Sequence, residues 1–445
     1  MLSKIDNILE TIDKNEIGLE NIDAASKEVV EILRDKKIVV YPAGTNGKLI
    51  QDALLSHGIK IAYFADKSYE SLKSIKEAPV YDSSALADIT DDYVVVISAN
   101  LRTQYEFFQR LVREINPKAN MVDGRNLNRL LKSTKCMQKL NENAVFDLLE
   151  CENCGFERKH CPIASKYLKS VGNFKEIEND HRSVKFDWVG CIVSQTCSLK
   201  CTHCCEHVPS LSDKGFLSVE TIVKDVRKIA QSSHFLNYVE LIGGEPFLHP
   251  EIERLITELL KIENIGYIKS FTNGTVVPSD ELCEIMKNPR FMLSVSNYER
   301  VANGKLLENI FKTRKKLADL EIKYLFSENF EWLDFSSFDL RDTDVPTLKK
   351  GFKDCFISIC HRIYKGKLYR CPHQYAGVQL GKLEEFPNEC IDLHSFDEVG
   401  LSQALERFED IQFLDACRHC TLPIGANPVP AGEQLRKSET STLNA

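Results

Sequence analysis

The stretch that decides the fold of this chain runs from Ser194 to Val208 and reads SQTCSLKCTHCCEHV. It directly follows an apolar run that predicts a buried strand. Within it, Cys197, Cys201 and Cys204 stand in the pattern C-x3-C-x2-C. A loop this short can present three thiolates to one side of a single group, and soft thiolates suit iron–sulfur clusters. Three thiolates would leave one iron of a four-iron cluster open to a ligand other than cysteine.

Two later strands end in short turns that suit a ligand. The run YVELIG ends in Gly243, Gly244 and Glu245, and the run YIKSFTNG ends in a turn that contains Thr272 and Asn273. Barrel folds build their active sites at the carboxyl ends of such strands. Glycine also lets the backbone approach a ligand closely, because it carries no side chain. These turns therefore indicate a ligand site beside the cysteine loop.

The cysteine loop and the two turns, in this order, resemble the radical S-adenosylmethionine (SAM) superfamily over roughly residues 184–330. The resemblance implies a partial (β/α)6-type barrel with a [4Fe–4S] cluster on the three cysteines. It further implies that SAM chelates the open iron and is reductively cleaved to a 5′-deoxyadenosyl radical, which abstracts hydrogen from a substrate. A zinc knuckle, or a set of unrelated cysteines, is the alternative interpretation.

The resemblance also suggests how SAM is held. Gly243, Gly244 and Glu245 would bind its amino group, and the backbone of His203 would lie near its adenine. The candidates for the ribose and carboxylate contacts are Thr272, Asn273, Ser294 and Ser296. No residue is assigned to the transfer of hydrogen.

Cysteines near the C-terminus predict a second metal site. Cys355 and Cys371 bracket IYKGKLY, which alternates like a short hairpin that turns at Gly366, and Cys417 and Cys420 form a C-x2-C pair. This arrangement resembles the twitch or SPASM-type extensions of radical SAM enzymes, which bind auxiliary iron–sulfur clusters. No cysteine follows the C-x2-C pair, which favours the shorter twitch form with one auxiliary [4Fe–4S] cluster.

The ligand set of this second site has alternatives. Cys360 is an alternative to Cys355, and Cys390 has no assignment. A structural zinc site with four cysteines is the alternative to a cluster. His361 and His373 flank the hairpin but receive no role, since a lone histidine is more often a structural residue.

A third group of cysteines precedes the barrel. Cys136, Cys151, Cys154 and Cys161 could bind zinc or a further cluster, or some of them could simply pack at a domain boundary.

The N-terminal part has the pattern of a nucleotide-binding module. The turn YPAGTNGKL, residues 41–49, lies between a predicted strand and a predicted helix, where backbone N–H groups could hold a phosphate. Asp66 ends the next strand, at the place of a ribose-binding acid. Only Gly44 and Gly47 of a G-x-G-x-x-G pattern are present. The stretch resembles Rossmann-like modules of sugar and cell-surface polysaccharide pathways, and a docking or structural module is the alternative.

The alternation of apolar strands and amphipathic helices predicts an α/β protein with a Rossmann-like parallel sheet, a partial barrel and a small Cys-rich extension. Strands are expected at 184–193, 237–242, 267–272, 291–296 and 322–327. The expected domains are a Rossmann-like domain (1–135), a Cys-containing linker (136–180), the radical SAM barrel (181–345), a twitch-like domain (346–428) and a flexible tail (429–445).

Composition limits the classes of partner. The 445 residues include 57 basic and 65 acidic side chains, for a net charge of −8, which argues against nucleic acid as the main partner. No apolar run approaches the ~20 residues of a membrane span, and the first residues do not resemble a signal peptide. Together with 16 clustered cysteines, these features predict a cytoplasmic protein in a reducing compartment.

The sequence therefore predicts a radical SAM enzyme of oxidoreductase or mutase/epimerase type. The Rossmann-like neighbour favours a small substrate such as a sugar, a nucleotide sugar or a cell-envelope precursor. A flavodoxin or ferredoxin is the expected reductant. A maturase that acts on a peptide is the alternative.

Overall fold

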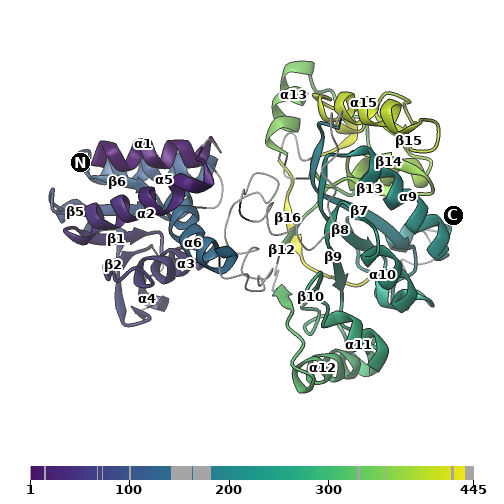
Figure 1. Cartoon of the computed structure of the whole chain (residues 1–445), viewed down its shortest axis with the longest axis horizontal. Coiled ribbons are helices and arrows are strands. Elements are labelled where there is room, and N and C mark those ends of the chain that lie inside the picture. Colours follow the sequence, from purple (N-terminus) through teal and green to yellow (C-terminus); the bar gives the residue numbers. More distant parts are fainter. Residues whose placement is uncertain are drawn as a thin grey trace. The chain divides into compact units, whose positions relative to one another are not determined.

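The computed structural model describes residues 2–14, 17–67, 69–72, 74–99, 102–141, 163, 182–327, 331–355, 357–421 and 425–435. The chain divides into two compact units, Met1–Tyr167 and Leu168–Ala445. Both are mixed α/β structures with largely parallel sheets (Figure 1), which confirms the predicted fold class. In the described part of the chain, no helix is long and apolar enough to span a membrane.

The first unit is built on a parallel sheet. Its strands are β1 (Lys37–Tyr41), β2 (Ile61–Ala65), β3 (Ser74–Ile75), β4 (Ala78–Tyr81), β5 (Tyr93–Ile97) and β6 (Met121–Asp123). They lie in the order β3-β4-β2-β1-β5-β6, with only the β3–β4 pair antiparallel. The helices are α1 (Leu2–Asp13), α2 (Leu19–Arg34), α3 (Thr45–Leu55), α4 (Tyr69–Leu72), η1 (Ser83–Asp88), α5 (Arg102–Ile115) and α6 (Gly124–Asn141).

Buried β-branched residues explain this sheet. The central strands β1 and β5 pair in register, and Val39, Val40, Val95 and Val96 are fully buried there. A strand buried on both faces must be apolar throughout, as its sequence shows. Numbered along the chain, the parallel strands follow the order 3-2-1-4-5, the order of a doubly wound sheet.

The second unit contains one large sheet in the order β11-β10-β9-β8-β7-β13-β14-β15. The parallel barrel strands are β7 (Lys185–Ser194), β8 (Phe235–Gly243), β9 (Ile265–Thr272), β10 (Phe291–Ser296) and β11 (Leu325–Ser327). The remaining strands are β13 (Arg362–Tyr364), β14 (Lys367–Tyr369) and β15 (Cys390–Asp392), with β12 (Glu331–Leu333) and β16 (Pro428–Pro430) as a separate antiparallel pair.

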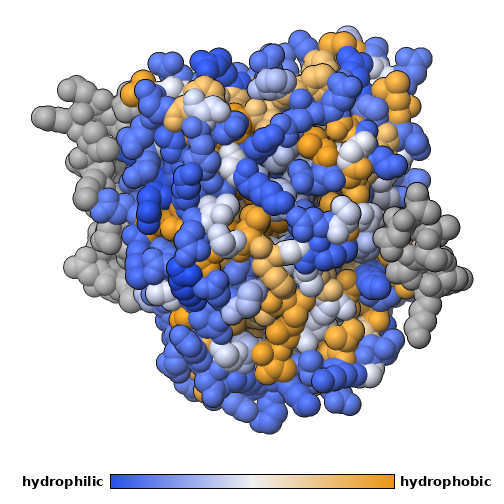
Figure 2. All heavy atoms as spheres, turned by 90° about the vertical axis from the view of Figure 1, so that its right-hand side faces the viewer, coloured by the Kyte–Doolittle hydropathy of each residue, from blue (hydrophilic) through white to orange (hydrophobic). Residues whose placement is uncertain are grey.

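Helices pack on one face of this sheet and bury an apolar core between themselves and the strands. They are α9 (Val219–Ser232), α10 (Ile252–Leu260), α11 (Asp280–Met286), α12 (Gly304–Asp319) and α15 (Glu398–Glu409). Helices α13 (Val345–Asp354) and α14 (Pro372–Gln379) pack in two smaller apolar clusters. Short 3-10 helices are η3 (Val208–Ser210), η4 (Pro246–Leu248) and η5 (Asp415–His419). Helix α9 begins with Ser218 as its N-cap, whose side chain accepts the Thr221 N–H. The face shown in Figure 2 is mostly hydrophilic, with its hydrophobic side chains in separate groups.

The structure differs from the sequence prediction at the C-terminal hairpin and tail. The hairpin turns at Gly366 as predicted, but it also extends the barrel sheet, because β13 pairs in parallel with β7. A flexible tail was expected from residue 429, yet residues 428–430 form β16, which pairs with β12. This pairing satisfies the backbone of a segment whose composition alone suggests a loop.

Candidate active site

The three cysteines of the loop that follows β7 line one cavity. This cavity has a volume of about 540 Å³, and its wall includes Cys197, Cys201 and Cys204. The volume lies in the range of small-molecule sites, roughly 300–1,000 Å³. The loop lies at the carboxyl end of β7, so the cavity opens at the end of the barrel where such folds place their chemistry.

Each of these sulfur atoms receives a hydrogen bond from a nitrogen. The Leu199 backbone N–H donates to Cys197 Sγ at 3.5 Å, and the Asn273 side-chain amide donates to the same atom at 3.6 Å. The side-chain amide of Gln434 donates to Cys201 Sγ at 3.2 Å. The Val208 backbone N–H donates to the Cys204 sulfur and so works to lower its pKa. Donors of this kind stabilise thiolates, the form in which cysteine binds metal.

Burial disfavours the charged, thiolate form of these three cysteines. Burial raises the pKa of Cys197 to about 11 and that of Cys204 to about 12, and it also raises the pKa of Cys201. A bound cationic group would reverse this effect, because it supplies the compensating charge. Three buried thiols with N–H donors in one cavity therefore fit a [4Fe–4S] cluster.

The glycine turn that follows β8 is joined to the cysteine loop through its backbone. The Gly244 N–H donates to the Ser194 carbonyl at 2.7 Å, and the Glu245 N–H donates to the Thr196 carbonyl at 2.9 Å. A Cβ at Gly244 would lie 2.0 Å from the Thr196 carbonyl oxygen, and Gly243 has a φ of +121°. Only glycine permits this approach, so the two glycines bring the turn against the cluster loop.

Glu245 holds the next strand end rather than pointing into solvent. Its side chain is 1% exposed and accepts the Thr272 hydroxyl at 2.8 Å and the Asn273 N–H at 2.8 Å. It also accepts the Phe247 N–H at 3.1 Å, as the N-cap of η4. Burial raises the pKa of this carboxyl to about 7. The predicted SAM-binding turns after β8 and β9 are therefore locked together by one buried side chain.

The other predicted SAM-binding residues line the cavity, with the exception of Ser294. Thr272, Asn273 and Ser296 line the cavity, and so does His203, whose Nδ1 lies 3.2 Å from Asp334 Oδ1. Ser294 is 3% exposed and lies two residues further into β10, on the same face as Ser296 but below the wall. The structure therefore brings together all the predicted SAM-binding residues except Ser294.

A buried ion pair in the same cavity was missed by the sequence analysis. Arg362 donates from Nε and Nη2 to Glu206 Oε1, at 2.8 and 2.6 Å, and both side chains are almost fully buried. Arg362 Nη1 donates to the carbonyls of Cys360 and His361. Glu206 lies in the cysteine loop and Arg362 in β13, so the pair attaches the C-terminal hairpin to the loop. No local pattern links two residues 156 positions apart.

Aromatic and apolar side chains close the rest of the cavity. Trp332 and Leu333 of β12 line it, together with Phe335, Tyr298 and Ile357. The sequence predicts a role for none of them, because scattered aromatic residues carry no spacing signal. They give the cavity a largely apolar wall.

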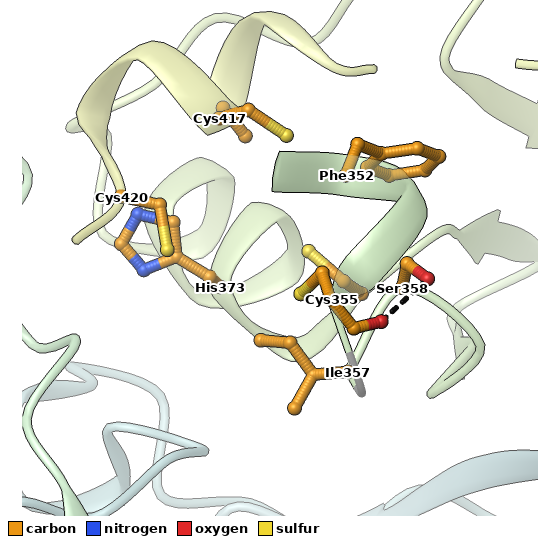
Figure 3. A pocket seen from close by; sticks show the side chains of 9 residues that line it. Phe352, Cys355, Ile357, Ser358, His373, Cys417 and Cys420 are labelled. Carbon is orange, nitrogen blue, oxygen red and sulfur yellow. Dashed lines mark hydrogen bonds between the residues drawn. The ribbon is translucent and has the colours of Figure 1, made fainter. Parts of the chain in front are cut away.

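The C-terminal cysteines form a second, smaller cavity. Cys355, Cys371, Cys417 and Cys420 all line it, and Figure 3 shows three of these thiols facing the same space. The Gln374 N–H donates to Cys371 Sγ at 3.4 Å. The Leu414 N–H donates to Cys417 Sγ, also at 3.4 Å, and burial raises the pKa of this thiol to about 12.

The structure places Cys355, and not Cys360, with the other three cysteines. Cys360 lines the larger cavity, so the alternative ligand set is not the one that the fold assembles. Cys390 lies in β15 and packs in a small apolar cluster with Tyr369 and Tyr375. His373, 1% exposed, lines the smaller cavity and stacks on Phe338. No group of three His, Cys, Asp or Glu side chains within the described ranges converges as the ligands of one metal ion do.

His361 has a structural environment away from both cavities. Its Nε2 lies 3.0 Å from Glu409 Oε1 and 2.7 Å from Arg370 Nη1. The contacts of His361 and Arg370 hold the pKa of Glu409 down, at about 2, although burial alone would raise it.

Of the third cysteine group, Cys136 lies in α6 and is partly buried. The predicted partners Cys151, Cys154 and Cys161 lie outside the described residues.

In the first unit, the predicted ribose-binding acid is engaged by its own turn. Asp66 Oδ2 accepts the Ala43 N–H at 2.9 Å. Gly44 is the N-cap residue of α3, and a Cβ at Gly47 would lie 2.8 Å from the Pro42 carbonyl oxygen. Asp66 thus fixes the turn, and Gly47 lets α3 pack closely on β1.

Comparison with known proteins identifies the barrel. A family model described as the Radical SAM superfamily matches residues 191–324. The GTP 3′,8-cyclase of Clostridium acetobutylicum is 31% identical over 100 residues, which are 22% of this chain and 31% of that protein. The GTP 3′,8-cyclase of Clostridium botulinum is 23% identical over 153 residues, which are 32% of this chain and 47% of that protein. The chain thus spans less than half the length of these curated relatives.

Among solved structures, BtrN in complex with AdoMet and 2-DOIA aligns with a TM-score of 0.32 and 14% identity, over 54% of this chain and 94% of that chain. The match to the family model covers the cysteine loop and the turns after β8 and β9. Residues 191–324 of this chain thus form a domain that matches the radical SAM superfamily.

Proposed function

We propose that this chain is a radical SAM enzyme that forms a 5′-deoxyadenosyl radical and removes a hydrogen atom from a small substrate. One observation carries the proposal: the three-cysteine loop and the glycine turn line one cavity and are joined by backbone hydrogen bonds. Cys197, Cys201 and Cys204 are the proposed cluster ligands. The turn at Gly243, Gly244 and the backbone of Glu245 is the proposed site for the amino group of SAM.

The cofactors of a radical SAM domain are a [4Fe–4S] cluster and SAM, and together they supply one-electron cleavage of a carbon–sulfur bond. The residues of this chain position those cofactors. Glu245 fixes the ends of β8 and β9 relative to each other through Thr272 and Asn273. The Asn273 side chain in turn donates to Cys197 Sγ, which connects the turn after β9 to the cysteine loop.

The apolar wall of the cavity serves the reaction by excluding water and competing hydrogen donors. Trp332, Leu333 and Phe335 lie on this wall, next to the proposed SAM site. A carbon radical formed in such a cavity meets only the substrate that the cavity admits. This requirement explains why the wall beside the cysteine loop is aromatic and aliphatic.

We also propose that Cys355, Cys371, Cys417 and Cys420 bind an auxiliary [4Fe–4S] cluster of the twitch type. The shared cavity and the N–H donors to Cys371 and Cys417 support this assignment. Such a cluster can accept the electron left on a substrate radical or hold the substrate.

The proposed substrate is a sugar, a nucleotide sugar or a similar cell-envelope precursor. A cavity of about 540 Å³ suits a small molecule beside SAM. Relatives named GTP 3′,8-cyclase support a substrate that carries a nucleotide. The doubly wound strand order of the first unit is in keeping with a Rossmann-like module, for which a nucleotide-type ligand is proposed.

A flavodoxin or ferredoxin is the proposed electron donor, and the cytoplasm is the proposed location. The cysteines in the described part of the chain are free thiols, as expected for a protein that keeps its clusters in a reducing compartment.

The first test counts iron and the product of SAM cleavage. After anaerobic reconstitution, the protein should hold about eight irons and form 5′-deoxyadenosine with dithionite and SAM. The triple variant Cys197→Ala, Cys201→Ala, Cys204→Ala should form none and retain about four irons, because only the auxiliary site remains.

Cys360→Ala is the matched control for this test, because Cys360 lines the same cavity outside the cysteine loop. It should keep about eight irons. Cleavage of SAM by the triple variant would contradict the proposed function. Zinc in place of iron in that variant would contradict the auxiliary cluster.

A further inference from the structure

The segment that follows β16 crosses to the cysteine loop and binds it through its backbone. The Thr202 N–H donates to the Glu433 carbonyl at 2.8 Å, and the Leu435 N–H donates to the Lys200 carbonyl at 2.8 Å. Cys201 and Gln434 form an antiparallel bridge between these bonds. The central cysteine of the loop is therefore paired, strand against strand, with a residue 233 positions further along the chain.

The Gln434 side chain has one possible orientation in this pairing. Its Oε1 accepts the Lys200 N–H at 2.8 Å, and its Nε2 donates to the Gly432 carbonyl at 2.7 Å. Exchanging the two atoms would set a donor against a donor and an acceptor against an acceptor. The second hydrogen of Nε2 is therefore directed to Cys201 Sγ, at 3.2 Å.

The segment is anchored just before this contact. Strand β16 pairs with β12, and Trp332 and Leu333 of β12 line the cavity. Gly432 has a φ of +72°, and a Cβ there would lie 2.8 Å from the Tyr298 ring, which also lines the cavity. Gln434 is thus held at Cys201 by contacts on its own segment and on the loop.

We propose that Gln434 is a positioning residue of the SAM-binding cluster, which it holds and tunes through the hydrogen bond to Cys201. Reduction adds negative charge to a cluster and its thiolates. An N–H donor aimed at a thiolate stabilises the reduced form and so raises the reduction potential. The C-terminal segment thereby becomes part of the machinery that makes the cluster reducible. This inference rests on the proposed function.

The test is a redox titration of the anaerobic, reconstituted full chain, followed by the EPR signal of the cluster that changes when SAM is added. That change separates the SAM-binding cluster from an auxiliary one. Gln434→Leu removes the donor, and the potential of this cluster should become more negative than in the wild type. Gln434→Glu keeps an acceptor for the Lys200 N–H but lacks the donor, and it should shift the potential in the same direction.

Glu433→Ala is the matched control, because the Glu433 side chain is exposed and only its backbone contacts the loop. The reduction potential of the SAM-binding cluster in Glu433→Ala should equal that in the wild type. As a second measurement, a chelator should remove iron from Gln434→Leu faster than from the control, on the order of tenfold.

Two negative results have different meanings. A wild-type protein with no SAM-sensitive cluster would overturn the proposed function. A SAM-sensitive cluster whose potential is the same in Gln434→Leu and the wild type would overturn only the role of Gln434.

Discussion

At the scale of single residues, Glu245 shows how one side chain can organise a site without facing its ligand. The carboxylate accepts hydrogen bonds from the Thr272 hydroxyl and from the N–H groups of Asn273 and Phe247. In the proposed function, the backbone of this turn and not the Glu245 carboxylate would therefore contact SAM. The role of Glu245 in SAM binding stays a prediction, and the structure shows that its side chain fixes the ends of β8 and β9.

Glu245 leads to a prediction on pH dependence. Burial raises the pKa of this carboxyl to about 7 in the folded protein, above the usual 4.5 of the unfolded chain. Between pH 4.5 and about 7, the folded state binds a proton at Glu245 that the unfolded state does not. The contribution of this proton to the unfolding free energy is therefore fully present below pH 4.5 and is lost as the pH rises through about 7. The difference in unfolding free energy between wild type and Glu245→Gln should therefore fall by ~3 kcal/mol between pH 4 and pH 8.

Denaturant unfolding of the anaerobic apoprotein at several pH values measures this difference. Glu281→Gln is the control, because Glu281 lies exposed on α11. A raised pKa of Glu245 would be refuted if the difference in unfolding free energy between the wild type and Glu245→Gln stayed constant with pH.

At the scale of elements, Asp225 of α9 secures the C-terminal hairpin to the barrel. The side chain is 2% exposed, and its Oδ2 accepts the Gly366 N–H at 2.8 Å. Its Oδ1 lies 2.7 Å from His394 Nε2. The tight hairpin turn is thus tied to a barrel helix, and this contact supports the parallel pairing of β13 with β7.

Asp225→Ala should lower the unfolding free energy by about 2–4 kcal/mol, because the buried Gly366 N–H loses its acceptor and His394 loses its partner. Asp213→Ala is the matched control. Asp213 pairs with Lys365 of the same hairpin, but both side chains are more than half exposed, so its loss should cost under about 1 kcal/mol.

Denaturant unfolding measures both variants, and hydrogen exchange in β13 and β14 shows where the protein opens. Equal losses in Asp225→Ala and Asp213→Ala would mean that the buried contact does not hold the hairpin.

At the scale of the whole molecule, both candidate cavities belong to the second unit. The residues that line them extend from Cys197 to Cys420, within Leu168–Ala445. The first unit has its own sheet and its own buried core. The chemistry proposed for the chain therefore requires only residues of the second unit.

A fragment of residues 182–445 should consequently bind about eight irons and cleave SAM to 5′-deoxyadenosine. Metal analysis of the fragment beside the full chain also tests the predicted site at Cys136, Cys151, Cys154 and Cys161, which the fragment lacks. Further iron or zinc in the full chain alone would support that site. A soluble, folded fragment that binds no iron would contradict the assignment of both cavities to the second unit.

The sequence by itself determined the α/β class, the strands of the barrel and the three-cysteine loop with its glycine turn. These features are local, because the periodicity of apolar residues, the spacing of cysteines and the choice of turn residues each depend on a few neighbouring positions. The C-x2-C pair and the hairpin were visible for the same reason.

Only the tertiary structure decided which distant residues meet. It brought Cys355 rather than Cys360 to the other three cysteines, joined β13 to β7, and paired Glu206 with Arg362. It also brought Gln434 to Cys201, from a segment that composition alone marks as a tail. Such contacts depend on how whole elements pack. Residues that are joined by a long loop can meet at almost any separation in the sequence, so their spacing does not predict the contact.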